Sequence, residues 1–178
     1  MRLGTLTFAV PTLFGLEGLC ADEMRRLELE DVRAENGRVL CSGSEAALPR
    51  LNLNLRTGER VLLVLGSFRA ADFDALFEGT RALPWERFIP KDGQFPVKGH
   101  CLNSALHSVP ACQAIVKKAV AARLGSKYGL NTLPETGALY QIQFSIMKDT
   151  ATLMLDTSGP GLYKRGYRAQ GVDAPLRE

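Results

Sequence analysis

The spacing of apolar and polar residues predicts an alternation of helices and strands from the start of the chain. The apolar run at 6–10 predicts a buried strand. The pattern over 17–29 is typical of an amphipathic helix, with Cys20 and Met24 on its apolar face. Asn36-Gly37 predicts a two-residue hairpin turn in which both residues have positive φ. Ser44 is expected to cap the next helix.

The remaining elements of this first segment are strands at 31–34, 38–42 and 60–68 and a helix at 45–56. The resulting order is strand, helix, hairpin, helix, strand. This order is typical of a split βαβ unit, so the first 68 residues are expected to form a ferredoxin-like subdomain.

A second segment follows with its own helix signals. Asp72 is placed to cap a helix that carries Phe73, Leu76 and Phe77 on one side. The longest predicted helix starts at Ser108, has Pro110 in its first turn and closes at Tyr128-Gly129. The predicted strands are 94–99, 139–147 and 151–155, the last two joined by a tight turn at 148–150. The fold class is therefore α+β.

The composition is that of a globular protein with one ordinary domain or two small ones. The chain has 178 residues, of which 46% are hydrophobic and 23% charged. This excludes a disordered tail, a fibrous repeat and a collagen-like chain. No apolar stretch reaches the length of a membrane span, and no signal-peptide cleavage site follows the first strand, so a cytoplasmic protein is expected.

The formal charge of +3 conceals an uneven distribution. Residues 97–128 contain five basic side chains and no acidic one, a net charge of +5: Lys98, Lys117, Lys118, Arg123 and Lys127. Residues 157–172 are also free of acid and contain Lys164, Arg165 and Arg168. Such a concentration of cations attracts polyanions by Coulomb steering and counterion release.

Two interpretations of this basic stretch remain open. Lys117 and Lys118 lie on the side of the predicted long helix opposite Cys112 and Val116, and are expected to be free to face a phosphate backbone. Nearby candidates for phosphate contact are Lys98, His100, Asn103 and Ser104. The alternative is an ordinary solvated helix face, with Arg123 and Lys127 complementing the helix C-terminus.

No catalytic or cofactor motif is evident. The chain has no G-x-G-x-x-G and no P-loop. The set His100, Cys101, His107 and Cys112 fits no common zinc spacing. Cys20 has no partner that would activate it, so a buried core thiol is the favoured interpretation.

Several segments resemble the N-terminal region of THUMP-containing class I RNA methyltransferases of bacteria. The segments are 15–19 (G-L-E-G-L), 73–86, 95–100, 109–119 and 149–168, the last of which is the most specific together with the first. The similar proteins are large-subunit rRNA guanine-N2 methyltransferases, often labelled N6-adenine-specific DNA methylases. The resemblance covers nearly the whole chain.

The resemblance implies a ferredoxin-like subdomain over 1–68, a THUMP domain over 69–160 and a linker over 161–178 into a methyltransferase domain that the chain lacks. The family's catalytic domain starts near 174–178, and neither a Gly-rich S-adenosylmethionine loop nor an N/D-P-P-Y/F motif is present. No cofactor is therefore expected in this chain. S-adenosylmethionine is expected in the missing domain.

The function that follows is an RNA-binding module that holds structured RNA, such as large-subunit rRNA, for its own C-terminal catalytic domain. The expected RNA-binding residues are Lys98, His100, Asn103, Ser104, Lys117, Lys118, Arg123, Lys127, Lys164, Arg165 and Arg168. The alternatives are a chain that itself methylates nucleic acid, a protein-interaction or assembly module, and a part of a DNA adenine methylase.

Overall fold

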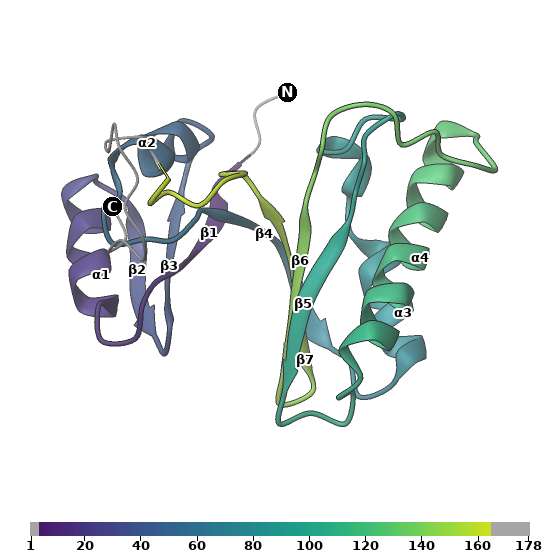
Figure 1. The fold of residues 1–178 in the computed structure, drawn as a ribbon, viewed down its shortest axis with the longest axis horizontal. Coiled ribbons are helices and arrows are strands. Elements are labelled where there is room, and N and C mark those ends of the chain that lie inside the picture. The colour runs from purple at the N-terminus through teal and green to yellow at the C-terminus, as the bar shows by residue number, and fades with distance from the viewer. Residues whose placement is uncertain (1–3, 165–178) are drawn as a thin grey trace, which may run out of the picture. The chain divides into compact units, whose positions relative to one another are not determined.

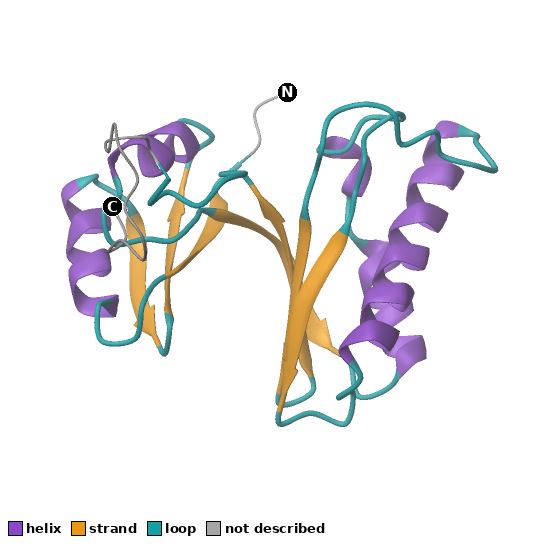
Figure 2. Cartoon of the chain, in the orientation of Figure 1, coloured by secondary structure: helices purple, strands orange, loops and turns teal. Residues whose placement is uncertain are grey.

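The computed structural model describes residues 4–164, which divide into two compact units. Unit 1 takes in the chain up to Leu63 and again from Thr157, and unit 2 is Val64–Asp156. Each unit combines helices with strands, as Figure 2 shows by colour. The α+β class predicted from the sequence is confirmed.

Unit 1 has the predicted order of strand, helix, hairpin, helix, strand. Its elements are β1 (Leu6–Pro11), α1 (Glu17–Arg26), β2 (Glu30–Glu35), β3 (Arg38–Gly43), α2 (Ala47–Asn54) and the start of β4 (Leu62–Arg69). The strands lie in the order β2-β3-β1-β4. β3 pairs antiparallel with both β1 and β2. Fully buried side chains on these elements, including Phe8, Met24 and Leu51, form the core of the unit.

The helix boundaries of unit 1 differ from the prediction in three places, the third being the end of α2 at Asn54 instead of 56. α1 ends at Arg26 rather than 29, because Glu28 takes a φ of 58° and turns Leu29 into the core. Ser44 does not cap α2 with its side chain. The helix begins at Ala47, whose N–H is bonded to the Ser44 carbonyl.

The hairpin at Asn36-Gly37 forms, but with a different turn. Gly37 has a φ of 74°, whereas Asn36 is not among the residues with positive φ, so only one of the two expected positive angles occurs. The turn is fixed by Glu17, whose carboxylate accepts hydrogen bonds from the N–H groups of Gly37 (2.9 Å) and Gly15 (2.8 Å). These bonds, that of Gly37 first, lower the pKa of Glu17.

Residues 157–164 belong to unit 1. The Thr157 N–H donates to the Val61 carbonyl (3.0 Å), and the Leu162 N–H donates to the Glu59 carbonyl (2.8 Å). Leu162 is 9% exposed. The segment that follows the last strand of unit 2 therefore returns to unit 1 and packs there.

Unit 2 is a sheet with two helices on one face (Figure 1). After β4 come α3 (Phe73–Ala82), the 3-10 turn η1 (Trp85–Arg87), β5 (Val97–Leu102), α4 (Val109–Tyr128), β6 (Ile142–Met147) and β7 (Thr150–Asp156). The strand order is β4-β7-β6-β5. β5 pairs parallel with β6, and β6 pairs antiparallel with β7.

The helix signals of unit 2 are confirmed. The Asp72 side chain caps α3 by accepting from the Ala75 N–H (2.7 Å). α4 has Pro110 in its first turn and ends at Gly129, which has a φ of 66°. The β6–β7 turn has positive φ at Lys148 and Asp149, the pattern of a tight type I′ turn.

The strand β5 starts later than predicted, at Val97 instead of 94. Pro96 has no N–H to donate to a ladder, and the pairing with β6 begins directly after it, with Val97 opposite Ile142. β6 likewise begins at Ile142 rather than 139.

Within residues 4–164, no helix combines the length and apolar character that crossing a membrane requires.

Candidate nucleic-acid interface

The sheet of unit 2 has one face without helices, which we call the open face. Cys101 lies on the opposite face, since its Sγ is 3.8 Å from Sγ of Cys112 on α4. Because side chains alternate along a strand, Lys98, His100 and Leu102 lie on the open face, and all three are exposed.

The register of the strands extends this face across the sheet. Three rows run from β5 through β6 to β7: Lys98, Gln143, Met154; His100, Ser145, Thr152; and Leu102, Met147, Thr150. β4 adds Ser67, whose Oγ is 3.1 Å from Oγ1 of Thr152, and by alternation Arg69. In the middle row, His100 Nε2 and Ser145 Oγ share a hydrogen bond of 3.0 Å.

The open face carries two exposed cations, Lys98 and Arg69, and several hydroxyl groups, whereas Ser145 and Met154 within it are buried. None of the side chains in the three rows is acidic. The nearest carboxylate on β7, Asp156, accepts a hydrogen bond from Nε2 of Gln143 (3.3 Å) beyond the Lys98 row. Among the described residues, neither Lys98 nor Arg69 forms an ion pair. Such a surface favours an anionic ligand.

A loop held by hydrogen bonds follows β5 at one end of this face. Asn103 is exposed and has a φ of 49°. Ser104 does not supply the free donor expected from the sequence. Its Oγ donates to the Leu102 carbonyl (3.0 Å) and accepts from the Asp149 N–H (3.1 Å). The Ala105 N–H donates in turn to Oδ1 of Asp149 (2.8 Å), which ties the loop to the β6–β7 turn.

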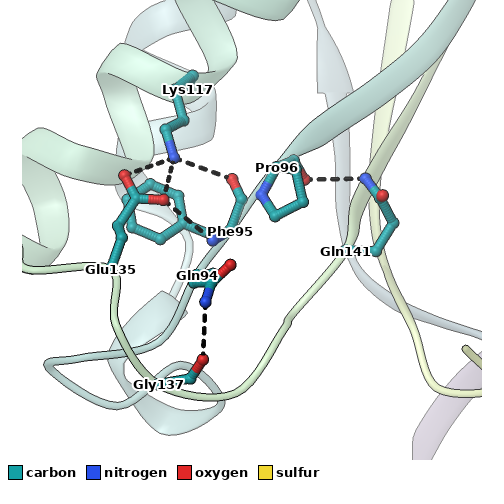
Figure 3. A network of polar contacts seen from close by, with 7 residues as sticks. All are labelled: Gln94, Phe95, Pro96, Lys117, Glu135, Gly137 and Gln141. Carbon is teal, nitrogen blue, oxygen red and sulfur yellow. Dashed lines mark hydrogen bonds and ion pairs between the residues drawn. The ribbon is translucent and has the colours of Figure 1, made fainter.

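The expectation that Lys117 is free to face a phosphate is wrong. Its Nζ lies 2.6 and 2.7 Å from the two carboxylate oxygens of Glu135 and 3.3 Å from the Phe95 carbonyl (Figure 3). It also sits 3.6 Å from the centre of the Phe95 ring. The ion pair and the hydrogen bond of Lys117 therefore hold the loop that contains Glu135 against the segment that leads into β5.

Arg123 is also neutralised inside unit 2. Its Nε and Nη2 lie 2.9 and 2.6 Å from the carboxylate of Glu86, a two-pronged ion pair. The hydrogen bond from Arg123 is the main cause that lowers the pKa of Glu86. Tyr128, whose hydroxyl donates to the Ile89 carbonyl (2.7 Å), joins the same cluster, and burial raises its pKa.

Replacing Glu86 by glutamine is expected to lower the free energy of unfolding of unit 2 at pH 7 by about 1–2 kcal/mol. A carboxyl group whose pKa is lowered in the folded state stabilises the fold at any pH above its ordinary pKa of 4.5. That stabilisation is lost as the pH falls through the lowered pKa. The difference between Glu86→Gln and the parent chain should therefore shrink in acid. Urea unfolding of both chains at pH 7 and below pH 4 measures this difference in the free energy of unfolding.

The matched control is Glu78→Gln. Glu78 pairs with Arg81 at 3.4 Å, but both side chains are more than half exposed, so little change is expected at either pH. An equal loss for the two variants at pH 7 would contradict the structural role of the Glu86 pair.

The other predicted cations lie apart from these. Lys118 and Lys127 are exposed on α4, with Nζ of Lys118 5.9 Å from the Phe77 ring on α3. Lys164 is exposed in unit 1 beside Tyr163. Arg165 and Arg168 lie outside the described residues. The single cationic surface between strand and long helix expected from the sequence is therefore wrong, since β5 presents Lys98 and His100 away from α4.

Residues of the open face outside the basic stretch were missed from the sequence. Ser67 on β4 and Thr152 on β7 belong to strands that were predicted, whereas Arg69 lies one residue beyond the predicted strand 60–68. The alternation in S-F-R and T-A-T carried the signal. What could not be read from one sequence is the strand order β4-β7-β6-β5, which brings β4 and β7 into one sheet with β5.

Cys20 and Cys41 are buried thiols. All four cysteines are free. Burial raises the pKa of Cys20 to about 11 and that of Cys41 to about 12, so both remain thiols at neutral pH. In the described part of the chain, no three His, Cys, Asp or Glu side chains gather in a way that could hold a metal ion.

Comparison with protein families identifies both halves of the chain. Residues 7–62 match the RlmL ferredoxin-like domain, and residues 70–156 match the THUMP domain. The chain therefore consists of an RlmL-type ferredoxin-like domain followed by a THUMP domain, and the resemblance to THUMP-containing RNA methyltransferases is confirmed.

Two curated relatives show what kind of protein carries this pair of domains. "Putative RNA methyltransferase YpsC" of Bacillus subtilis is 44% identical over 180 residues, which is 100% of this chain and 46% of YpsC. "Ribosomal RNA large subunit methyltransferase K/L" of Syntrophotalea carbinolica is 33% identical over 92% of this chain and 23% of its own length. The chain thus spans about half of the first relative and about a quarter of the second.

Two solved structures that resemble this chain are also described as a methylase or a methyltransferase. A protein of Listeria monocytogenes described as a "predicted N6-adenine-specific DNA methylase" has a TM-score of 0.92 and 47% identity, covering 98% of this chain and 46% of that one. "SMU.472, a putative methyltransferase complexed with SAH" has a TM-score of 0.89 and 40% identity, covering 94% of this chain and 45% of that one.

Proposed function

We propose that this chain is the RNA-binding module of an RNA methyltransferase whose catalytic domain lies outside the chain. The observation that carries the proposal is the THUMP domain over residues 70–156, in a chain similar over its whole length to an RNA methyltransferase. S-adenosylmethionine would bind in the catalytic domain, since a similar structure is described with SAH. The module would hold structured RNA in reach of that domain.

The finer assignment is to large-subunit ribosomal RNA and methylation of guanine N2. The K/L relatives are named for the large subunit, which supports the first part. The assignment of guanine N2 as the methylated atom is based on the motif resemblance. Phosphate contacts of the module would position the RNA, and the selection of the modified base would belong to the catalytic domain.

The open face of unit 2 is the RNA-binding surface in this proposal. Lys98 and Arg69 supply charge that no carboxylate of the described residues neutralises, and His100 and the exposed Asn103 supply hydrogen-bonding groups. Lys118, Lys127 and Lys164 remain further candidates on other surfaces. Lys117, Arg123 and Ser104 act on the fold in this scheme, because their polar groups are bonded within unit 2.

Binding to a fragment of large-subunit rRNA at several salt concentrations tests this surface. The double variant Lys98→Ala/Arg69→Ala should weaken binding and reduce the slope of log affinity against log salt by roughly 0.7–0.9 for each phosphate group that is no longer bound. Lys91→Ala, an exposed lysine in the loop between η1 and β5, is the control and should leave the slope unchanged. An unchanged affinity and slope in the double variant would remove the open face from the proposal.

The DNA alternative has one observation in its favour, the description of the Listeria structure. Competition separates the two. The RNA proposal expects rRNA fragments to displace a labelled rRNA probe at much lower concentration than duplex DNA of equal length. A stronger competition by DNA would favour the methylase alternative, and no binding of either polymer would favour an assembly module.

A further inference from the structure

An exposed pair of apolar side chains lies within the open face. Leu102 is 51% and Met147 41% exposed, and the two are direct partners in the register of β5 and β6. A single exposed apolar residue needs no explanation. Two adjacent ones, in a face whose other exposed side chains are polar, provide a surface that phosphate binding does not require.

Polar groups of defined kind surround the pair. His100 lies one row along β5 from Leu102, with its imidazole bonded to Ser145. Thr150 is the partner of Met147 on the other side, and Arg69 continues this edge on β4. The surface therefore combines an apolar pair at the end of the strands with an imidazole and a guanidinium.

The backbone beneath this surface is firmly held. The Lys148 N–H is bonded to the Leu102 carbonyl (3.4 Å), and the Ala70 N–H is bonded to the Asp149 carbonyl (2.7 Å). With the bond from Ala105 to Asp149, these contacts connect β4, the β6–β7 turn and the end of β5. A ligand that binds here meets a preformed surface and orders little of it.

The chemistry of the pair distinguishes two forms of RNA. A double helix hides the faces of its bases and presents phosphates and ribose hydroxyls, which gain nothing from Leu102 and Met147. An unpaired nucleotide exposes a flat apolar base that can lie on such side chains and stack on an imidazole or a guanidinium. Its phosphates suit Lys98 and Arg69. The absence of acidic side chains from the rows agrees with this anionic ligand.

We infer that the open face binds an unpaired segment of RNA, with a base on Leu102 and Met147 beside His100 and with the adjoining phosphates at Lys98 and Arg69. The inference rests on the proposed function and narrows it, since it names loops, bulges or ends of the structured RNA as the part that this face receives.

The test compares an unstructured RNA of about ten nucleotides with a blunt duplex that contains the same sequence, using fluorescence anisotropy with the 178-residue chain. The parent chain should bind the single strand more tightly. Leu102→Ser and Met147→Ser should each weaken binding of the single strand about fivefold or more and change duplex binding less than about twofold. Leu139→Ser, at a leucine 64% exposed before β6, should change neither.

Two further measurements protect the interpretation. Thermal melting by circular dichroism should show equal stability for the three variants, because all three leucine and methionine side chains are exposed. Met147→Leu should restore tight binding of the single strand. Equal binding of single strand and duplex, or equal losses for Leu102→Ser and Leu139→Ser, would overturn the inference while leaving RNA binding in place. Failure of the parent chain to bind any RNA would instead overturn the proposed function.

Discussion

Replacing Trp85 by alanine is expected to lower the free energy of unfolding of unit 2 by about 3–5 kcal/mol. Trp85 is fully buried and is the largest side chain of the core. Its indole Nε1 donates a hydrogen bond of 2.7 Å to the Thr80 carbonyl at the end of α3. Truncation would leave a cavity below α4 and remove this hydrogen bond, so packing and hydrogen bonding both weaken.

Urea unfolding followed by far-UV circular dichroism measures the loss, and hydrogen exchange with mass spectrometry locates it. Faster exchange is expected in peptides of α3 and α4, with α1 and β1 unchanged. Trp85→Phe should recover most of the stability, and Phe88→Ala, at a half-buried neighbour, should cost clearly less. Loss of protection spread equally over α1 and α4 would contradict the expectation that the loss is confined to unit 2.

The elements that the sequence predicted well are those with local chemical signals. Asp72 caps α3 through its own side chain, and Pro110 and Gly129 bracket α4. Each of these signals acts within one turn of the helix, so tertiary packing does not alter it. The ferredoxin-like order of unit 1 was predicted for the same reason, because periodicity and turns are local.

The boundaries that were missed depend on partners far away in the chain. β5 begins at Val97 because its ladder partner is Ile142, and α1 ends early because Leu29 is drawn into the core. Ser44 has the residue type of a cap, yet the helix starts three residues later. A single sequence does not contain the register of strands or the depth of a core, so these positions required the structure.

The site shows the same division. Residues 97–128 do contain five basic and no acidic side chains. That count, however, says nothing about carboxylates from other parts of the chain that pack against these residues. Glu86 and Glu135 lie 37 and 18 positions from Arg123 and Lys117 in the sequence, and each neutralises its partner. In the proposed function, Lys98 on β5 and Arg69 on β4, which form no ion pair with a described carboxylate, are the cations of the open face. When the paired cations Lys117 and Arg123 are removed from the predicted RNA-binding residues, the open face becomes the more specific hypothesis for the RNA-binding surface.

Replacing Gly99 by alanine is expected to destabilise unit 2 by about 2–3 kcal/mol and to weaken RNA binding at the same time. A Cβ at this position would lie 2.3 Å from the Phe144 carbonyl oxygen and 2.5 Å from its ring. Phe144 is the register partner of Gly99 and is buried, so backbone and ring must both shift to admit a methyl group. β5 would move away from β6, and Lys98 and His100, which flank Gly99, would move with it.

Gly18→Ala in α1 is the matched control, since the same methyl group meets nothing within 4 Å there. In a helix, glycine to alanine should raise stability by about 0.5–1 kcal/mol. We therefore expect urea unfolding to show opposite signs of stability change for the two variants, and anisotropy with the single-stranded RNA to show a loss of affinity only for Gly99→Ala. If Gly99→Ala is as stable as the parent chain and binds the RNA as tightly, β5 has room to spare beside β6 and the close approach does not position Lys98 and His100. A stable variant with reduced affinity would separate the placement of these two side chains from the packing energy, because the methyl group itself points to the helix-covered face and cannot touch RNA on the open one.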